Sequence, residues 1–168
     1  AHAKGERAGD RNLNRNLAPT DSPVDFEDRV ANWLCPLLAG HDVLLDLHST
    51  QARNGAFCML GPGDNDGPLQ PFRHAARERA LALRLGVHRF VDGWLDTYAM
   101  GVERRLQRIG NPASRADVLN TDPRYGVGTT EYMRSRGGCA LTLECGQHDD
   151  PDSPEVGYRA IVNALSHL

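Results

Sequence analysis

His48 stands at a position in the sequence where a protein could hold a metal ligand. It follows the apolar run 43–47, which has the length and composition of a buried strand, and it comes two residues after Asp46. A metal-binding histidine usually donates its second ring N–H to a carboxylate or a carbonyl group. The alternative is a histidine that packs in a loop or lies at the surface. The other histidines form no H-x-x-x-H or H-E-x-x-H pair, so local spacing does not complete a zinc site.

Glu144 is a carboxylate at the end of a second apolar run, 139–143. Removing a carboxylate from water is unfavourable unless the group has a partner or a chemical task. Partly buried carboxylates are common in active sites, where they accept and donate protons. The alternative is a structural salt bridge with Arg134 or Arg136.

A dense set of hydrogen-bond donors lies near the start of the sequence. Guanidinium groups bind carboxylates through two parallel hydrogen bonds, so such a set suits an anionic substrate. The alternative is a solvated, charge-rich loop. The set consists of Arg7, Arg11, Asn12, Asn14, Arg15 and Asn16.

The elements expected around these residues alternate between strands and helices. Apolar runs and helical spacing predict strands over 43–47, 87–91 and 139–143, and helices over about 23–39, 71–85 and 154–168. Residues 1–22 read as an irregular, polar segment, and the composition of 92–138 is typical of loops, so no element is predicted there. This alternation predicts a three-layer α/β/α domain. In such sheets ligands bind beyond the carboxyl ends of the strands, where His48 and Glu144 are expected.

The first helix has predicted boundaries of its own. Asp21-Ser22-Pro23 has the composition of a helix start, and Gly40 that of a helix end. Pro36 should kink or shorten the helix. The large apolar residues between these limits are expected to form one buried face; they are Phe26, Val30, Trp33, Leu34, Leu37 and Leu38.

Length and composition narrow the class of protein. The 168 residues suit a single domain, 1–168, and a net charge of −3 offers no basic face for nucleic acid. No run approaches the ~20 apolar residues of a membrane span. The polar start has neither a signal peptide nor an initiator Met. We therefore expect a cytoplasmic fragment of a longer protein, with its four cysteines reduced and buried.

Three segments, taken in order, resemble one enzyme family. Residues 7–15, RAGDRNLNR, resemble a segment in which an arginine lies eight residues before the last arginine of an R-D-L-N-R motif. Residues 46–50, DLHST, resemble a D-L-H-[SN]-T strand end, and residues 142–146, TLECG, resemble a closing [TI]-x-E-x-G segment. The sequence is thereby similar to the succinylglutamate desuccinylase/aspartoacylase family of zinc-carboxypeptidase-like enzymes, from Arg7 to about His148.

This resemblance implies a role for each matching residue. His48 would be a zinc ligand, and Glu144 the general base that activates a zinc-bound water and passes its proton to the leaving amine. Arg7 would stabilise the oxyanion beside the metal. Asn14 and Arg15 would hold a carboxylate of the substrate.

The sequence also departs from the family pattern. Asn12 stands where the family has Asp, and the upstream H-x-x-E that supplies two zinc ligands is absent. The β domain that follows the catalytic domain is absent as well. Arg134 matches the offset of a second anion-binding arginine, ten residues before the general base, but its neighbours agree poorly. The expected fold is therefore zinc-carboxypeptidase-like with a mixed, largely parallel sheet that lacks its N-terminal strands.

The resemblance implies a zinc-dependent hydrolase that cleaves the amide bond of an N-acyl amino acid, a small carboxylated substrate. Zn²⁺ is expected in the intact enzyme and is expected to bind weakly, or not at all, to this chain, which we therefore expect to be inactive by itself. An exposed sheet edge would favour homo-oligomers. The alternatives are a metallocarboxypeptidase or peptidoglycan-peptide amidase, and a non-catalytic domain that binds carboxylates.

Overall fold

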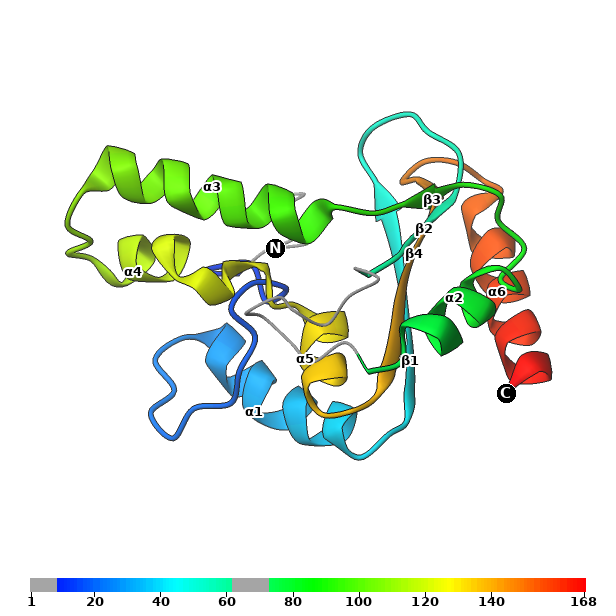
Figure 1. The fold of residues 1–168 in the computed structure, drawn as a ribbon, viewed down its shortest axis with the longest axis horizontal. Helices are drawn as coiled ribbons and strands as arrows, with labels where there is room; N and C mark the ends of the chain where they lie inside the picture. Colours follow the sequence, from blue (N-terminus) through cyan, green and yellow to red (C-terminus); the bar gives the residue numbers. More distant parts are fainter. Residues whose placement is uncertain (1–8, 62–72) are drawn as a thin grey trace.

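In the computed structural model, which describes residues 9–61 and 73–168, four strands form one sheet (Figure 1). The order across the sheet is β1-β4-β2-β3, and β1 pairs parallel with β4, β3 pairs parallel with β2, and β2 pairs antiparallel with β4. The sheet is thus mixed and mostly parallel, as predicted. The strands are β1 (Val43–Thr50), β2 (Phe57–Met59), β3 (Phe90–Val91) and β4 (Cys139–Gln147).

Helices cover both faces of this sheet, which confirms the predicted three-layer arrangement (Figure 1). Helices α1 (Phe26–Ala39) and α5 (Thr129–Ser135) pack on one face, and α2 (Ala75–Ala82) and α6 (Ser153–His167) pack on the other. No helix in the described ranges is long and apolar enough to cross a membrane.

The protein has two hydrophobic cores, one on each face of the sheet, and successive side chains of β4 point alternately into one and the other. Leu141 and Leu143 point toward α2 and α6, whereas Ala140 points toward α1 and α5. Successive side chains of a strand lie on opposite faces of the sheet, so Glu144 lies on the same face as Ala140. The α1 and α5 side of the sheet is therefore the one that carries the polar residues of interest.

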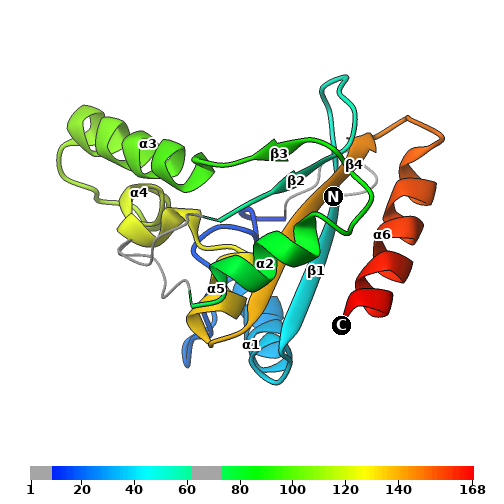
Figure 2. The same cartoon turned by 45° about the vertical axis from the view of Figure 1, so that its right-hand side comes forward.

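The segment 92–138 contains a group of helices that the sequence did not predict. They are α3 (Trp94–Ile109), α4 (Arg115–Thr121), the 3₁₀ helix η2 (Pro123–Gly126) and α5. Helices α3 and α4 lie side by side at a distance from α6 (Figure 2). Gly and Pro residues between these helices give the segment the composition of a loop.

The strands β1 and β4 are both longer than predicted. β1 continues to Thr50 and β4 to Gln147, so His48 and Glu144 lie within strands and not after them. The predicted strand 87–91 is reduced to β3, and β2 was not predicted at all. The expected helix 71–85 appears as α2, and residues 71 and 72 fall outside the described ranges.

Helix α1 begins later than predicted. Its N-cap is Asp25, whose side chain accepts a hydrogen bond from the backbone of Asp28 in a capping box, so the predicted start at Asp21-Ser22-Pro23 is wrong. The predicted end at Gly40 is confirmed. The helix continues through Pro36, which therefore does not shorten it.

The predicted apolar face of α1 is confirmed only in part, because Leu38 is buried and Leu34 packs against the core but others are exposed. The helix turns small residues toward the sheet, where Ala31 and Cys35 are fully buried, and leaves Phe26, Trp33 and Leu37 exposed. Small side chains let a helix lie close to its neighbours. The buried face thus consists of the small residues together with Leu34 and Leu38.

All four cysteines are buried and none forms a disulfide, as expected. Burial raises the pKa of the Cys58 thiol to about 12 and that of Cys139 to about 11. Thiols with such pKa values stay protonated near neutral pH and are poor nucleophiles. These residues therefore belong to the cores and not to a reactive site.

Candidate functional site

His48 and Glu144 lie next to each other on neighbouring strands. They are partners in the parallel register of β1 and β4, so their side chains leave the same face of the sheet. Both line a hollow of about 150 Å³ that Asn14 and Arg15 also line. Four residues that the sequence singled out, from three separate segments, thus converge on one place.

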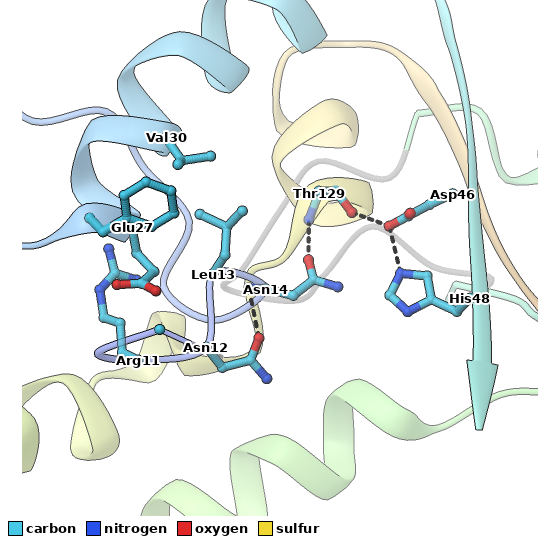
Figure 3. A pocket seen from close by; sticks show the side chains of 11 residues that line it. Arg11, Asn12, Leu13, Asn14, Glu27, Val30, Asp46, His48 and Thr129 are labelled. Carbon is cyan, nitrogen blue, oxygen red and sulfur yellow. Dashed lines mark hydrogen bonds and ion pairs between the residues drawn. The ribbon is translucent and has the colours of Figure 1, made fainter. Parts of the chain in front are cut away.

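Asp46 and Thr129 orient His48 (Figure 3). The Nε2 atom of His48 lies 3.1 Å from Oδ2 of Asp46, and the hydroxyl of Thr129 donates a hydrogen bond to the same oxygen. A neutral imidazole that donates Nε2–H carries its lone pair on Nδ1. Nδ1 is therefore the nitrogen of His48 that can bind a metal ion, in the arrangement expected of a histidine ligand with a carboxylate behind it.

Asn14 connects the polar loop to the start of helix α5. Its Oδ1 accepts a hydrogen bond of 2.8 Å from the backbone N–H of Thr129 (Figure 3). A Cβ at Gly128 would collide with this amide group, so only glycine allows so close an approach. Because Oδ1 is used in this way, the Nδ2 donors of Asn14 are the ones that can bind an oxygen atom in the hollow.

Arg15 is fixed by aromatic residues of α3 and η2. Its guanidinium carbon lies 4.5 Å from the ring centre of Tyr98 and 5.6 Å from that of Tyr125. One terminal nitrogen donates to the Tyr98 hydroxyl at 2.7 Å, and the other donates to the backbone oxygen of Asn14. The Nε atom is buried and has no hydrogen-bond partner within the described ranges. Arg15 therefore combines a restrained position with an unused donor, as a carboxylate-binding arginine should.

The aromatic wall of the hollow was missed by the sequence analysis. Trp94, Tyr98 and Met59 line it together with the polar residues, and the rings of Trp94 and Tyr98 meet edge to face with their centres 6.3 Å apart. Trp94, Tyr98 and Val102 recur every four residues, which is helical spacing. That spacing is the signal that could have revealed α3 and, with it, this wall.

Arg134 does not reach the hollow. Its side chain is 1% exposed, and its guanidinium forms hydrogen bonds with Glu78, with Glu131 and with the backbone oxygen of Ala140. A buried arginine with these partners holds α2, α5 and β4 together. Its predicted contact with a substrate does not fit this position. Its neighbour Glu131 does line the hollow, so Arg134 supports the wall from behind.

A complete zinc site does not follow from the residues that the structure describes. A catalytic zinc ion needs three protein ligands and an open position. Within residues 9–61 and 73–168, no group of three or more His, Cys, Asp or Glu side chains could hold a metal ion. The predicted oxyanion residue Arg7 lies outside the described residues. His48 is thus well placed as one ligand, but the described donor set does not fit a zinc ion by itself.

Comparison with solved structures identifies proteins with this fold. A succinylglutamate desuccinylase/aspartoacylase from Rhodobacter sphaeroides matches with a TM-score of 0.60 and 20% identity, over 94% of this chain and 37% of its own. The ectoine utilisation protein EutE (DoeB) from Ruegeria pomeroyi matches with 17% identity and a TM-score of 0.59 in both its product-bound and its apo structure. Those matches cover 94% and 96% of this chain and 39% and 42% of EutE.

These matches confirm the predicted resemblance at the level of the fold. The chain spans about two fifths of the length of the solved structures that it matches. Neither the family models nor the curated proteins yielded a match. The likeness therefore establishes a shared architecture.

Proposed function

We propose that this chain forms the part of a deacylase active site that binds an N-acyl amino acid and activates water to cleave its amide bond. The observation that carries the proposal is the convergence of His48, Glu144, Asn14 and Arg15 on one hollow, with His48 and Glu144 in register on adjacent strands. The fold shared with a desuccinylase/aspartoacylase structure supports the same reading.

Each residue has a role that its chemistry allows. The carboxylate of Glu144 accepts a proton from the attacking water and later delivers it to the leaving nitrogen, so that amide and water become a carboxylic acid and an amine. Arg15 and Asn14 bind the carboxylate of the substrate and fix its orientation. Asp46 holds His48 with Nδ1 toward the site, where we propose that it contributes one ligand to a zinc ion.

Equilibrium binding tests the substrate part of this proposal. An N-acetyl amino acid should bind about tenfold or more tightly than its C-terminal amide, because only the free carboxylate can pair with Arg15. The fluorescence of Trp94, which lines the hollow, can report binding. The measurement uses a Trp33→Phe background, because Trp33 is exposed and would add its own emission to the signal. Arg15→Lys should lose most of the preference, because a point charge replaces the fork of the guanidinium. Equal affinity for both ligands in the wild-type chain would overturn the proposal.

Glu144→Gln tests the catalytic part. The amide has nearly the shape of the carboxylate but cannot accept a proton, so in the intact enzyme the variant should bind the ligand and release amine at least ~100-fold more slowly than wild type. Retained turnover in Glu144→Gln would contradict the assignment of the base. Zinc analysis of the 168-residue chain by itself should find less than one tightly bound ion per chain.

The non-catalytic alternative has one observation in its favour, which is the lack of three metal ligands among the residues described. It requires selective carboxylate binding with no hydrolysis even when zinc is supplied. A metallocarboxypeptidase or peptidoglycan-peptide amidase would instead cleave peptides in preference to N-acyl amino acids.

A further inference from the structure

A second hollow lies on the face of the sheet that is opposite to the candidate site. Its volume is about 350 Å³, and it is lined by residues of α6, of the segment between α2 and β3, and of the segment that precedes β2. The segment from α2 to β3 runs beside α6 in both views of the ribbon (Figure 1, Figure 2). The hollow shares no lining residue with the one at His48 and Glu144, so a ligand bound here would leave the proposed active site open.

The floor of this second hollow is apolar and belongs to the core beneath α2 and α6. Leu85 and Val87 are buried members of that core, with exposed fractions of 1% and 8%. Ala56 and Val156 pack against the same core and are only partly buried. An apolar group of a ligand that covers this floor would remove the remaining apolar surface from water, which is favourable.

The polar groups around the floor are hydrogen-bond donors with a positive charge. Arg89 and Arg159 line the hollow with Asn163, and no carboxylate is among the lining residues that the structure describes. Arg159 forms an ion pair of 3.4 Å with Glu155, but both side chains are more than half exposed, and such pairs are weak. Arg89 forms no ion pair within residues 9–61 and 73–168. The hollow therefore attracts an anion and repels a cation.

The backbone and two glycines determine where these donors lie. The backbone oxygen of Arg89 accepts a hydrogen bond of 3.0 Å from the N–H of Cys58, which anchors Arg89 beside β2. Its guanidinium lies against Gly55, where a Cβ would come within 3.1 Å of a terminal nitrogen. The Nδ2 atom of Asn163 lies in the same way against Gly86, whose φ of +90° favours glycine. The donors are thus held close to the floor before a ligand binds.

An apolar floor with a positive rim fits an organic carboxylate. Guanidinium groups bind carboxylates through charge-assisted hydrogen bonds, and an attached apolar chain can cover the floor. An inorganic anion such as phosphate would leave the floor in contact with water. The volume of the hollow is of the order found for small-molecule sites. We propose that this hollow is a second binding site of the chain, that its ligand is a small carboxylate with an apolar chain, and that Arg89 binds the carboxylate.

Three small probes test the charge and the chain separately. Hexanoate carries both a carboxylate and an apolar chain, hexanol carries the chain without the charge, and inorganic phosphate carries charge without the chain. In two-dimensional NMR spectra of the ¹⁵N-labelled chain, hexanoate should shift the backbone signals of Gly86 and Val87 and the side-chain amide signal of Asn163. Its Kd at these signals should be about fivefold or more below those of hexanol and phosphate, because each of the two lacks one of the contacts.

Arg89→Gln tests the assignment of the binding residue. The substitution removes the charge at an exposed position and should raise the Kd of hexanoate at Gly86 about fivefold. Arg104→Gln removes an equal charge from an exposed position on α3 and should leave that Kd unchanged. Arg15→Lys alters the hollow on the opposite face and should also leave it unchanged, so the result does not depend on the proposed function.

Each outcome supports or overturns the inference. Equal Kd values for hexanoate and hexanol would show that the charge plays no part, and equal values for hexanoate and phosphate would show the same for the floor; either would overturn the proposed ligand. An unchanged Kd in Arg89→Gln would remove Arg89 from the site. Absence of shifts at Gly86, Val87 and Asn163 would overturn the site itself and leave the proposed function in place. The comparison of probes needs no variant, so it decides the matter even if Arg89→Gln does not fold.

Discussion

The position of the Arg15 guanidinium depends on two tyrosines that act in different ways. Tyr98 offers both its ring and its hydroxyl oxygen, whereas Tyr125 offers its ring alone. Stacking leaves the edges of a guanidinium available, and a hydrogen bond fixes the rotation of its plane. The hydroxyl of Tyr98 therefore decides which edge of Arg15 faces the hollow.

Tyr98→Phe should weaken binding of an N-acetyl amino acid by about fivefold, since a hydrogen bond of this kind contributes roughly 1 kcal/mol. Titration by Trp94 fluorescence measures the change. Tyr125→Phe removes a hydroxyl that makes no hydrogen bond to Arg15 and should leave the affinity as it is. Unchanged affinity in both variants would show that only the rings matter.

Individual residues differed in how far the sequence could place them. His48, Glu144, Asn14 and Arg15 carry short motifs, and strand alternation is enough to bring two of them to one face. Arg89 and Tyr98 carry no motif, because a single arginine or aromatic residue becomes informative only through its neighbours. Sequence offset alone placed Arg134 in the site, and no offset can distinguish an exposed arginine from one that is 1% exposed in a buried ion network.

At the scale of elements, four ion pairs attach the start of helix α1 to the rest of the site. Asp25, the N-cap residue, and Asp28, in the first turn, each bind both Arg11 of the polar loop and Arg115 of α4. Burial raises the pKa of Asp25, but hydrogen bonds from Arg115, from the backbone of Asp28 and from Arg11 outweigh it and lower the pKa to about 2. The loop that carries Arg15 is thereby held through charges that acid can remove.

The pH dependence of stability follows from the sign of this shift. The folded pKa of about 2 lies below the ordinary value of 3.8, so the stabilisation is complete above about pH 4 and is lost as pH falls toward 2. Asp25→Asn keeps a capping side chain and removes the charge. It should lower the free energy of unfolding by roughly 1 to 2 kcal/mol at pH 6, a value discounted because Arg115 is partly exposed, and by much less at pH 2.

Urea unfolding at the two pH values measures this difference. Asp21→Asn is the control, because Asp21 is exposed and precedes the helix. A destabilisation by Asp25→Asn that is the same at pH 6 and at pH 2 would mean that the helix cap, and not the ion pairs, is responsible.

Elements were predictable where local sequence determines them. The central parts of β1 and β4, the end of α1 at Gly40 and most of α6 follow from apolar runs and glycine. Helices α4 and α5 have seven residues each, which is too short for stability in isolation, so their helical state depends on tertiary contacts. The start of α1 was misplaced because a Ser-Pro pair resembles a cap, while the actual capping box of Asp25 and Asp28 is reinforced by distant arginines.

At the scale of the whole molecule, one side of the sheet combines a strand edge with apolar surface. β1 has a neighbouring strand only on the side of β4, within the part of the chain that the structure describes. Helices α1 and α6 lie on the two sides of this edge (Figure 1). Both helices turn small residues inward, so their large apolar residues are exposed; on α6 these include Ile161 and Leu165, and on α1 they include Trp33.

A strand edge flanked by such surface should make this chain self-associate. Backbone N–H and C=O groups of an unpaired edge bind a second strand, and burial of Trp33 and Ile161 would add hydrophobic stabilisation. Sedimentation or light scattering should show an average mass that rises with protein concentration. Trp33→Lys and Ile161→Lys should each reduce the rise, because a buried lysine opposes association. Leu83→Lys changes an equally exposed apolar residue at the end of α2 and should leave association unchanged. A monomer at every concentration would show that the polar residues along β1 protect this edge sufficiently.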